Sequence, residues 1–327
     1  PSVDPWLPGE GADIIIPSQW VIPNGPRTGI VINLAAMRLF YFPPVKKGAT
    51  PHVITHPVGI GRLEWNTPQG KARIASKSEA PTWRPTEAIR KEHAKDGEIL
   101  PAAVPPGPDN PMGEYVMRLS WPEYAIHGTN KPASIGMRGT HGCLRMYPED
   151  IAVLYKKVSV DTPVTVVNEP NLVGYRDDTL YLQTYPVLED DKRNHHPKLW
   201  TLLKGAQTAH RKVAGKASTS RINDALVQAQ AKQPRALAVP VTGNHAPLDQ
   251  WLAGAGTTVK NHLPQDATWD GEGDASVSPA AVSPATNVAS AEPVATTDKD
   301  SGMTDAMELS DSDAAMTDNT STSHSTS

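Results

Sequence analysis

The chain has 327 residues, of which 38% are hydrophobic, and its mean hydropathy is −0.41. This length suits one sizeable domain with appendages or two small domains, and the low hydropathy predicts that part of the chain does not join a packed core. The formal net charge of −4 gives no indication of a nucleic-acid partner, and no apolar run approaches the roughly 18 residues of a transmembrane segment.

Charge is distributed unevenly along the chain. Residues 265–327 contain twelve acidic side chains and one lysine, a net charge of −11, whereas the remainder carries +7. A mildly basic domain would suit a protein that binds an anionic polymer, although most excess positive charge of this size lies on solvated surface and has no partner. The chain begins with Pro1 and not with Met, so we interpret it as a processed or trimmed form that lacks a signal peptide.

Residues 1–26 form a leader rich in Pro and Gly, with one short apolar run at residues 14–16. Its first part, PSVDPWLPGEGADIIIP, resembles the end of a LysM module, the small glycan-binding domain of cell-wall proteins. An ordinary leader with one edge strand explains the same residues equally well.

Strands are predicted from residue 29 onward. The segment GIVINLAAMRLFYFPP (residues 29–44) predicts two strands joined by a tight turn, because β-branched and aromatic side chains favour the pleated backbone. Residues 52–61 and 71–77 predict two more. The proline-rich stretch 80–113 then interrupts the pattern with one predicted helix, capped by Thr86 and stopped by Gly97. This stretch is either a lid or substrate wall, or a plain surface insertion.

Residues 114–120 and 123–126 predict further strands, followed by a helix and a closing strand at residues 162–167. The helix begins at Pro148, and its apolar face recurs at helical spacing through Ile151 and Leu154. Many strands and few helices indicate a mainly β domain at residues 27–168. We predict a partly helical appendage at residues 169–233 and a disordered, low-complexity acidic tail at residues 234–327.

The chemistry is concentrated in residues 126–146, IHGTNKPASIGMRGTHGCLRM. This window contains Cys143, the only cysteine, together with His127 and His141. A thiol needs a nearby base to become a nucleophile and backbone donors for a developing oxyanion, so we infer cysteine-dependent acyl transfer. A buried structural cysteine is the alternative. The same three side chains could bind zinc, but no fourth ligand has suitable spacing, so we predict no metal.

The motifs in this window resemble those of the YkuD-type L,D-transpeptidases. That family has His-Gly-Thr followed by Ser/Thr-His-Gly-Cys, and this chain has HGT and then THGC, with Thr140 where many members have serine. The segments HPVGIGR, TPQGKARI, PTWRPT and DNPMG are similar to the periplasmic ErfK/YbiS subgroup. The resemblance spans residues 3–167. It implies a YkuD-like β-sandwich or barrel catalytic domain with one or two helices.

The resemblance also implies a reaction. These enzymes cleave the diaminopimelate–D-Ala bond of a peptidoglycan tetrapeptide stem, form a thioester on the cysteine, and pass the acyl group to an amine. The amine belongs to another stem or to a lysine of an outer-membrane lipoprotein. No cofactor is needed, and the compartment is the periplasm. The partners are therefore stem peptides and an outer-membrane lipoprotein, with no nucleic acid.

Roles follow for individual residues. The resemblance makes Cys143 the nucleophile and His127 the base, with the carbonyl of Gly128 orienting the imidazole. The backbone N–H groups of Gly142 and Cys143, with His141, would form the oxyanion hole, although His141 could equally be structural.

Two further residues, Arg145 and Thr140, are predicted to bind substrate. For Arg145 the reason is that a guanidinium matches the geometry of the stem carboxylates. Arg145 could instead be a surface ion-pair partner. A hydrolase with the same site, either an L,D-carboxypeptidase or a lipoprotein-releasing enzyme, and a non-catalytic wall-binding protein remain the alternative functions.

Overall fold

The computed structural model describes residues 13–15, 17, 19–214, 220–243, 248–254 and 258–260. Most of the predicted LysM-like stretch and most of the predicted acidic tail lie outside these described residues. No helix in the described part of the chain is long and apolar enough to cross a membrane.

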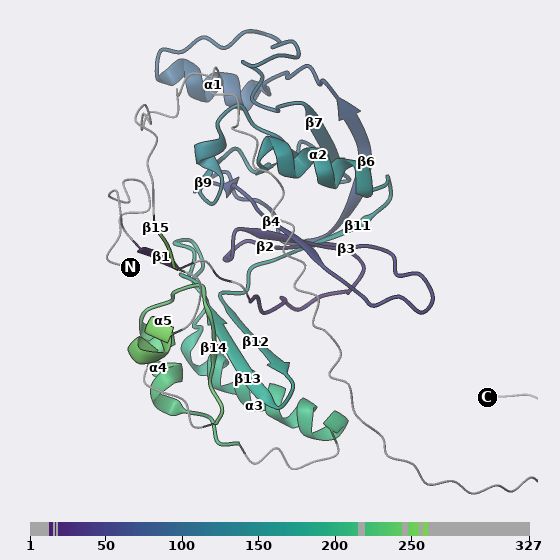
Figure 1. Cartoon of the computed structure of the whole chain (residues 1–327). Helices are drawn as coiled ribbons and strands as arrows, with labels where there is room; N and C mark the ends of the chain where they lie inside the picture. Colours follow the sequence, from purple (N-terminus) through teal and green to yellow (C-terminus); the bar gives the residue numbers. More distant parts are fainter. Residues whose placement is uncertain are drawn as a thin grey trace, which may run out of the picture. The chain divides into compact units, whose positions relative to one another are not determined.

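An eight-stranded sheet forms the centre of the first part of the chain (Figure 1). Its strands are β2 Gly29–Asn33, β3 Arg38–Phe42, β4 Ile54–Pro57, β6 Gly70–Glu79, β7 Tyr115–Leu119, β8 Ala125–His127, β10 Leu144–Arg145 and β11 Pro163–Val167. They occur in the order β10-β8-β7-β6-β11-β2-β3-β4. The pairs β2–β11 and β8–β10 are parallel and the others antiparallel. A two-stranded parallel sheet joins β5 Ile60–Gly61 to β9 Arg138–Thr140. The predicted mainly β class is confirmed.

Strand β2 is buried along its whole length. Ile30 and Ile32 pack into the main core, whereas Val31 packs with Phe40 in a separate cluster. An apolar run without alternation is typical of a strand covered on both faces. Each fully buried aliphatic side chain of this kind contributes about 1.5–3 kcal/mol to stability.

Helix α2, Pro148–Lys157, follows the cysteine window as predicted. Pro148 occupies its first turn, where the missing N–H costs nothing, and two acidic residues there complement the helix dipole. Ile151 and Leu154 are buried in the main core, so the predicted apolar face is the one that packs.

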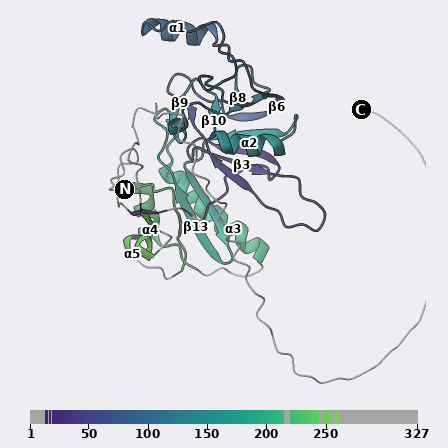
Figure 2. The same cartoon turned by 45° about the horizontal axis from the view of Figure 1, so that its top comes forward.

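The insertion between β6 and β7 contains helix α1, Glu87–Lys95, which Figure 2 shows standing apart from the strands of the sheet. The hydroxyl of Thr86 accepts from the Ile89 N–H at 3.3 Å, and Gly97 follows the helix in the left-handed conformation (φ 80°). Both predicted helix signals are confirmed. The helix has no buried residue, so the insertion depends on other contacts.

Asn110 organises this insertion. Its side chain is 1% exposed, donates to the carbonyls of Pro81, Val104 and Pro105, and accepts from the Met112 N–H at 2.9 Å.

We therefore expect Asn110→Ala to destabilise the protein by about 2–3 kcal/mol, because it removes two buried hydrogen bonds, to the Pro81 carbonyl and from the Met112 N–H. Urea unfolding measures this change, with Asn130→Ala at a partly exposed position as the matched control. Equal midpoints for the two variants would contradict the expectation.

The residues after β11 form a second assembly with its own core. Its elements are β12 Asn171–Arg176, β13 Thr179–Thr184, β14 Ala238–Pro240, α3 His196–Ala214, α4 Asp224–Lys232 and α5 Leu248–Gly254. The order in the sheet is β12-β13-β14. Leu180, Leu203, Val227 and Val239 are fully or almost fully buried in this core. Two short strands, β1 Asp13–Ile15 and β15 Thr258–Lys260, pair antiparallel, and one 3-10 turn, η1, spans Pro132–Ser134.

This assembly differs from the sequence prediction in two ways. A three-stranded sheet accompanies the predicted helices, and β14 and α5 lie beyond residue 233, where we predicted the tail to begin. The reason is that β14 has only three residues and pairs with β13, more than fifty positions earlier in the chain. Neither its length nor its local composition indicates a strand.

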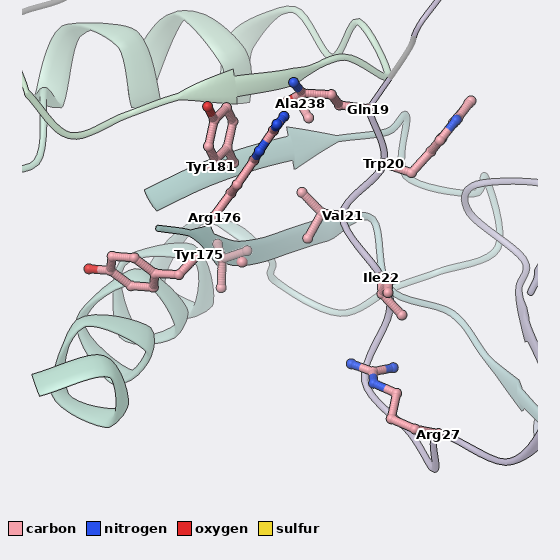
Figure 3. A pocket seen from close by; sticks show the side chains of 11 residues that line it. Gln19, Trp20, Val21, Ile22, Arg27, Tyr175, Arg176, Tyr181 and Ala238 are labelled. Atoms are coloured by element: carbon pink, nitrogen blue, oxygen red, sulfur yellow. The ribbon is translucent and has the colours of Figure 1, made fainter. Parts of the chain in front are cut away.

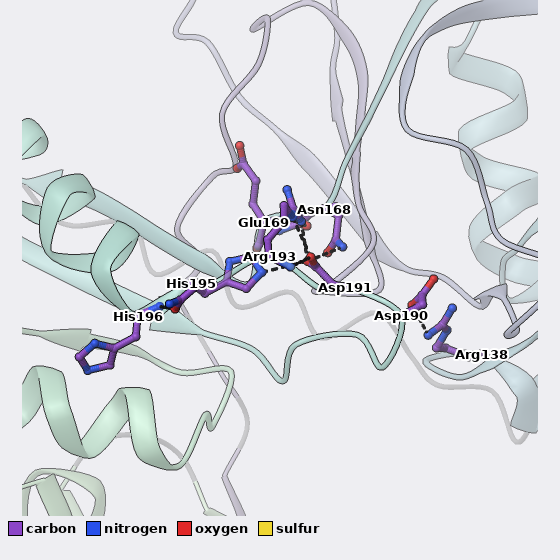
Figure 4. A network of polar contacts seen from close by, with 10 residues as sticks. Arg138, Asn168, Glu169, Asp190, Asp191, Arg193, His195 and His196 are labelled. Atoms are coloured by element: carbon purple, nitrogen blue, oxygen red, sulfur yellow. Dashed lines mark hydrogen bonds and ion pairs between the residues drawn. The ribbon is translucent and has the colours of Figure 1, made fainter.

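A polar network connects the segment after β13 to the end of β11 in the eight-stranded sheet (Figure 4). The Asp191 carboxylate accepts from Arg193, His195 and Asn168, and the hydrogen bonds from Arg193 hold the pKa of Asp191 well below its usual range. Arg193 also donates to the Asn168 carbonyl at 2.7 Å. The second assembly is thus attached directly to the end of β11.

Candidate active site

Strand register places the predicted catalytic residues on one face of the sheet. His127 of β8 is paired with Arg145 of β10 in parallel register, and Cys143 lies two residues before Arg145. Because side chains alternate along a strand, these three share a face. Their neighbours Ile126 and Leu144 are buried in the main core on the opposite face.

The Cys143 side chain is half-buried, and its Sγ lies 3.4 Å from the main-chain oxygen of Glu123. Burial raises the pKa of the Cys143 thiol, and the backbone of Ala125 and the charge of Arg145 oppose this only in part. The thiol is therefore protonated at neutral pH, so it must lose its proton to a base when it reacts.

His127 is suited to be that base. It is 4% exposed, and its Nδ1 lies 2.6 Å from the carbonyl oxygen of Gly128. A carbonyl can only accept, so Nδ1 carries the proton and Nε2 keeps its lone pair. Burial, followed by the charge of Arg145, lowers the pKa of His127 to about 4, although the hydrogen bond to Gly128 opposes the shift. The imidazole is neutral at neutral pH.

Acidification should destabilise the fold through His127. Its pKa is about 4 in the folded protein against 6.5 for an unperturbed histidine, so the unfolded chain binds more protons between these values. Stability present above pH 6.5 is lost as the pH falls through 4. The loss between about pH 7 and about pH 4.5 is on the order of 2–3 kcal/mol.

Urea unfolding at these two pH values measures the loss. His127→Gln should lose less stability on acidification by the amount assigned to the imidazole. An identical loss in both proteins would show that His127 does not titrate in this way.

The loop before the cysteine is fixed by Thr140 and Gly142. Gly142 has φ 99°, and a Cβ there would lie 2.6 Å from the Tyr124 ring, so only glycine fits. Thr140 is 1% exposed; its hydroxyl donates to the Cys143 carbonyl at 2.6 Å and accepts from the Gly142 N–H at 3.1 Å. The hydroxyl of Thr140, a residue predicted to bind substrate, thus holds the loop together, and the Gly142 N–H, predicted to form part of the oxyanion hole, donates to Thr140.

His141 faces the insertion. Its Nε2 lies 2.8 Å from Glu92 of α1, and Glu92 also pairs with Arg62 and accepts from the Trp65 indole at 3.3 Å. The Trp65 and His141 rings meet edge to face at 4.8 Å. Of the two roles left open for His141, these contacts correspond to the structural one. No local sequence pattern indicates the role of Glu92, because it lies 49 residues from His141.

Glu92→Gln should loosen α1, because it removes the carboxylate that joins the helix to the cysteine loop. Both partners are partly exposed, so we expect hydrogen exchange in α1 to be roughly two- to fivefold faster. Glu87→Gln on the same helix, where Glu87 pairs only with Lys91 one turn away among the described residues, is the matched control. Equal exchange in both variants would contradict a fastening role for Glu92.

Two guanidinium groups flank the thiol. Arg145 donates to the Ser134 hydroxyl at 3.4 Å, and its buried Nε has no hydrogen-bond partner among the described residues. Arg118 of β7 is exposed and paired with Ala125, on the same sheet face as the thiol. Both charges act against the burial that raises the pKa of Cys143. Arg118 was not predicted, and its only signal is its polar position in the otherwise apolar strand YVMRL.

The described residues also enclose a pocket of about 420 Å³ away from the cysteine window (Figure 3). Its walls include Trp20, Arg27, Tyr175, Arg176 and Tyr181, and none of its lining residues belongs to the window. In the described part of the chain no group of three His, Cys, Asp or Glu side chains could hold a metal ion.

Several known proteins are similar to this chain. A family model described as the L,D-transpeptidase catalytic domain (YkuD) matches residues 27–166. The protein named "Probable L,D-transpeptidase YbiS" of Escherichia coli K12 is 47% identical over 171 residues, which cover 52% of this chain and 54% of that protein. The protein named "Probable L,D-transpeptidase ErfK/SrfK" of Salmonella typhimurium is 37% identical over 238 residues, covering 69% and 72%.

Among solved structures, the NMR structure of the catalytic domain of an Enterococcus faecium L,D-transpeptidase is 25% identical, covers 42% of this chain and 95% of that one, and has a TM-score of 0.31. The chain spans about half the length of the curated Escherichia coli relatives that it matches. The agreement with the Salmonella relative extends over most of that protein. Taken with the match to the catalytic domain, it shows that this chain belongs to the L,D-transpeptidase family.

Proposed function

We propose that the chain is a peptidoglycan L,D-transpeptidase that acts through a thioester on Cys143. The observation that supports this most is that a protonated thiol and a neutral, buried imidazole lie on the same face of two adjacent strands. A neutral His127 with a free lone pair on Nε2 can accept the thiol proton, which a protonated imidazole could not do.

The acyl donor is a tetrapeptide stem, cleaved between diaminopimelate and D-Ala. His127 takes the proton of Cys143, and the sulfur attacks the carbonyl carbon. The N–H of Cys143 stabilises the oxyanion. The proton then passes from His127 to the departing amine as the C–N bond breaks, so D-Ala leaves and the thioester remains.

The second half-reaction reverses these roles. An amine attacks the thioester, its proton passes through His127 to the sulfur, and the C–S bond breaks. The energy of the original amide bond is kept in the thioester, so the reaction needs no ATP, metal or other cofactor. The acceptor is a diaminopimelate amine of another stem or a lysine of an outer-membrane lipoprotein, which places the protein in the periplasm.

Arg145 and Arg118 would bind the carboxylates of the donor stem. Both lie on the sheet face of the thiol, and the unpartnered Nε of Arg145 offers a donor that water cannot easily reach. A substrate carboxylate would supply the acceptor that this Nε lacks among the described residues.

Product analysis tests the proposal. The protein is incubated with tetrapeptide stems, with and without an amine acceptor, and products are separated and identified by mass spectrometry. Released D-Ala together with a new amide supports transpeptidation. Tripeptide alone, even with excess amine, would indicate a hydrolase. Unchanged stems, together with binding to intact peptidoglycan, would indicate a non-catalytic wall-binding protein.

A further inference from the structure

The turn between β7 and β8, residues 120–124, forms one wall beside the thiol. The main-chain oxygen of Glu123 lies 3.4 Å from the Cys143 Sγ. The Tyr124 ring packs against Gly142 so closely that a Cβ could not be added there. The Leu119 N–H donates to the Tyr124 carbonyl at 2.9 Å, which closes the turn. The position of this turn relative to the reacting sulfur is therefore fixed by contacts on both sides.

The backbone of Glu123 is strained. Its φ of 69° lies in the left-handed region, which costs a residue with a Cβ roughly 1–2 kcal/mol and favours glycine or asparagine. The main chain of Glu123 contacts the nucleophile in this conformation. Its side chain can offset the cost of the strain only if it interacts with a partner. Strained residues at a reacting centre are a recognised indication of function.

The Glu123 side chain has no such partner in the described protein. It is exposed, and neither a hydrogen bond nor an ion pair joins its carboxylate to any other described residue. The charged groups that act on the Cys143 thiol are Arg145, Arg118 and Glu123, so Glu123 is the single carboxylate among them. The positive charges near the thiol therefore come from the strands, and the negative charge comes from the turn.

This division of charge matches the two substrates of the proposed reaction. The donor stem carries carboxylates, whereas the acceptor approaches as a primary ammonium group. We propose that Glu123 binds the ammonium group of the acyl acceptor and that the β7–β8 turn is the acceptor side of the site. This inference rests on the proposed transpeptidation.

The carboxylate acts on binding and not on bond making. The ammonium group first pairs with Glu123 beside the thioester and releases one proton to water. The resulting amine then attacks the thioester carbonyl; a C–N bond forms, the C–S bond breaks, and the second amine proton reaches the sulfur through His127. Glu123 raises the local concentration of acceptor and favours aminolysis over hydrolysis.

The experiment separates the two half-reactions. Acyl-enzyme is first formed with a tetrapeptide stem and measured by intact mass. Nα-acetyl-lysine amide is then added as the acceptor probe, so that it competes with water for the acyl group. The ratio of amide to tripeptide is recorded at increasing probe concentration. Glu64→Gln is the matched control, because Glu64 is also exposed and also left-handed, with φ 70°.

Glu123→Gln should form acyl-enzyme at the wild-type rate but lower the amide-to-tripeptide ratio roughly three- to tenfold at subsaturating probe, and Glu123→Lys should lower it further. Glu64→Gln should not change it. With hydroxylamine, a nucleophile uncharged at neutral pH, the Glu123 variants should match the wild type.

Four results would overturn the inference. An unchanged ratio in Glu123→Gln would show that the carboxylate does not bind the acceptor. An equal loss with hydroxylamine, or slower acylation, would show a structural or donor-side role. A wild-type protein that forms no acyl-enzyme would reject the proposed function itself and the inference with it.

Discussion

Replacing Cys143 by alanine should abolish acyl-enzyme formation and lower D-Ala release by at least roughly 10³-fold. The described residues offer no other thiol, and the neighbouring hydroxyl of Thr140 is buried and occupied by the Cys143 carbonyl. Release of D-Ala, measured by a coupled amino-acid assay, gives the rate.

The melting temperature is the control for this variant. Cys143 is only half-buried and packs at the edge of a small apolar cluster, so its loss should change stability little. A folded Cys143→Ala protein that still releases D-Ala would rule out the thiol as the nucleophile.

His127→Gln should slow acylation by about 10²–10⁴-fold while the affinity for the donor stem changes little. Glutamine can still contact the Gly128 carbonyl, but it has no basic nitrogen to take the thiol proton. Arg145 and Arg118, which we propose bind the stem, remain in place. Pre-steady-state intact mass spectrometry gives the acylation rate at each stem concentration.

The pH profile provides a second readout for His127. In the wild type the acylation rate should fall as the pH approaches 4, because a protonated imidazole cannot act as a base. The variant should lack this acid limb. His56→Gln is the matched control: His56 is also buried and pairs with Asp150 at 2.9 Å, but it lies outside the cysteine window. Equal slowing in both histidine variants would indicate a structural effect.

Local sequence patterns predicted much of the catalytic domain. The apolar run before Asn33 predicted β2, Pro148 predicted the start of α2, and Thr86 predicted the start of α1. In each case the residues that carry the signal lie within a few positions of the element that they predict. The signals are a run of strand-forming side chains, a helix cap and the apolar face of a helix.

The surroundings of the thiol could not be predicted in this way, because strand register brings them together. Arg118 lies beside Cys143 only because β7, β8 and β10 are adjacent in the sheet, and Glu123 contacts the sulfur because the turn between β7 and β8 closes there. Likewise, Glu92 reaches His141 from a separate insertion. No local pattern encodes these contacts.

The second assembly also contains contacts that local sequence patterns could not predict. Val239 of β14 is fully buried against Leu182 of β13, yet the two residues come from segments separated by α3 and α4. A three-residue strand in an alanine-rich, polar stretch carries too weak a periodicity to distinguish it from a linker.

The intact mass of the protein after exposure to a tetrapeptide stem tests the central claim most directly. The account predicts a mass increase equal to the tripeptide acyl group, located on Cys143 by peptide mapping and absent from Cys143→Ala. No adduct on a folded wild-type protein, or an adduct on another residue, would contradict a Cys143 thioester.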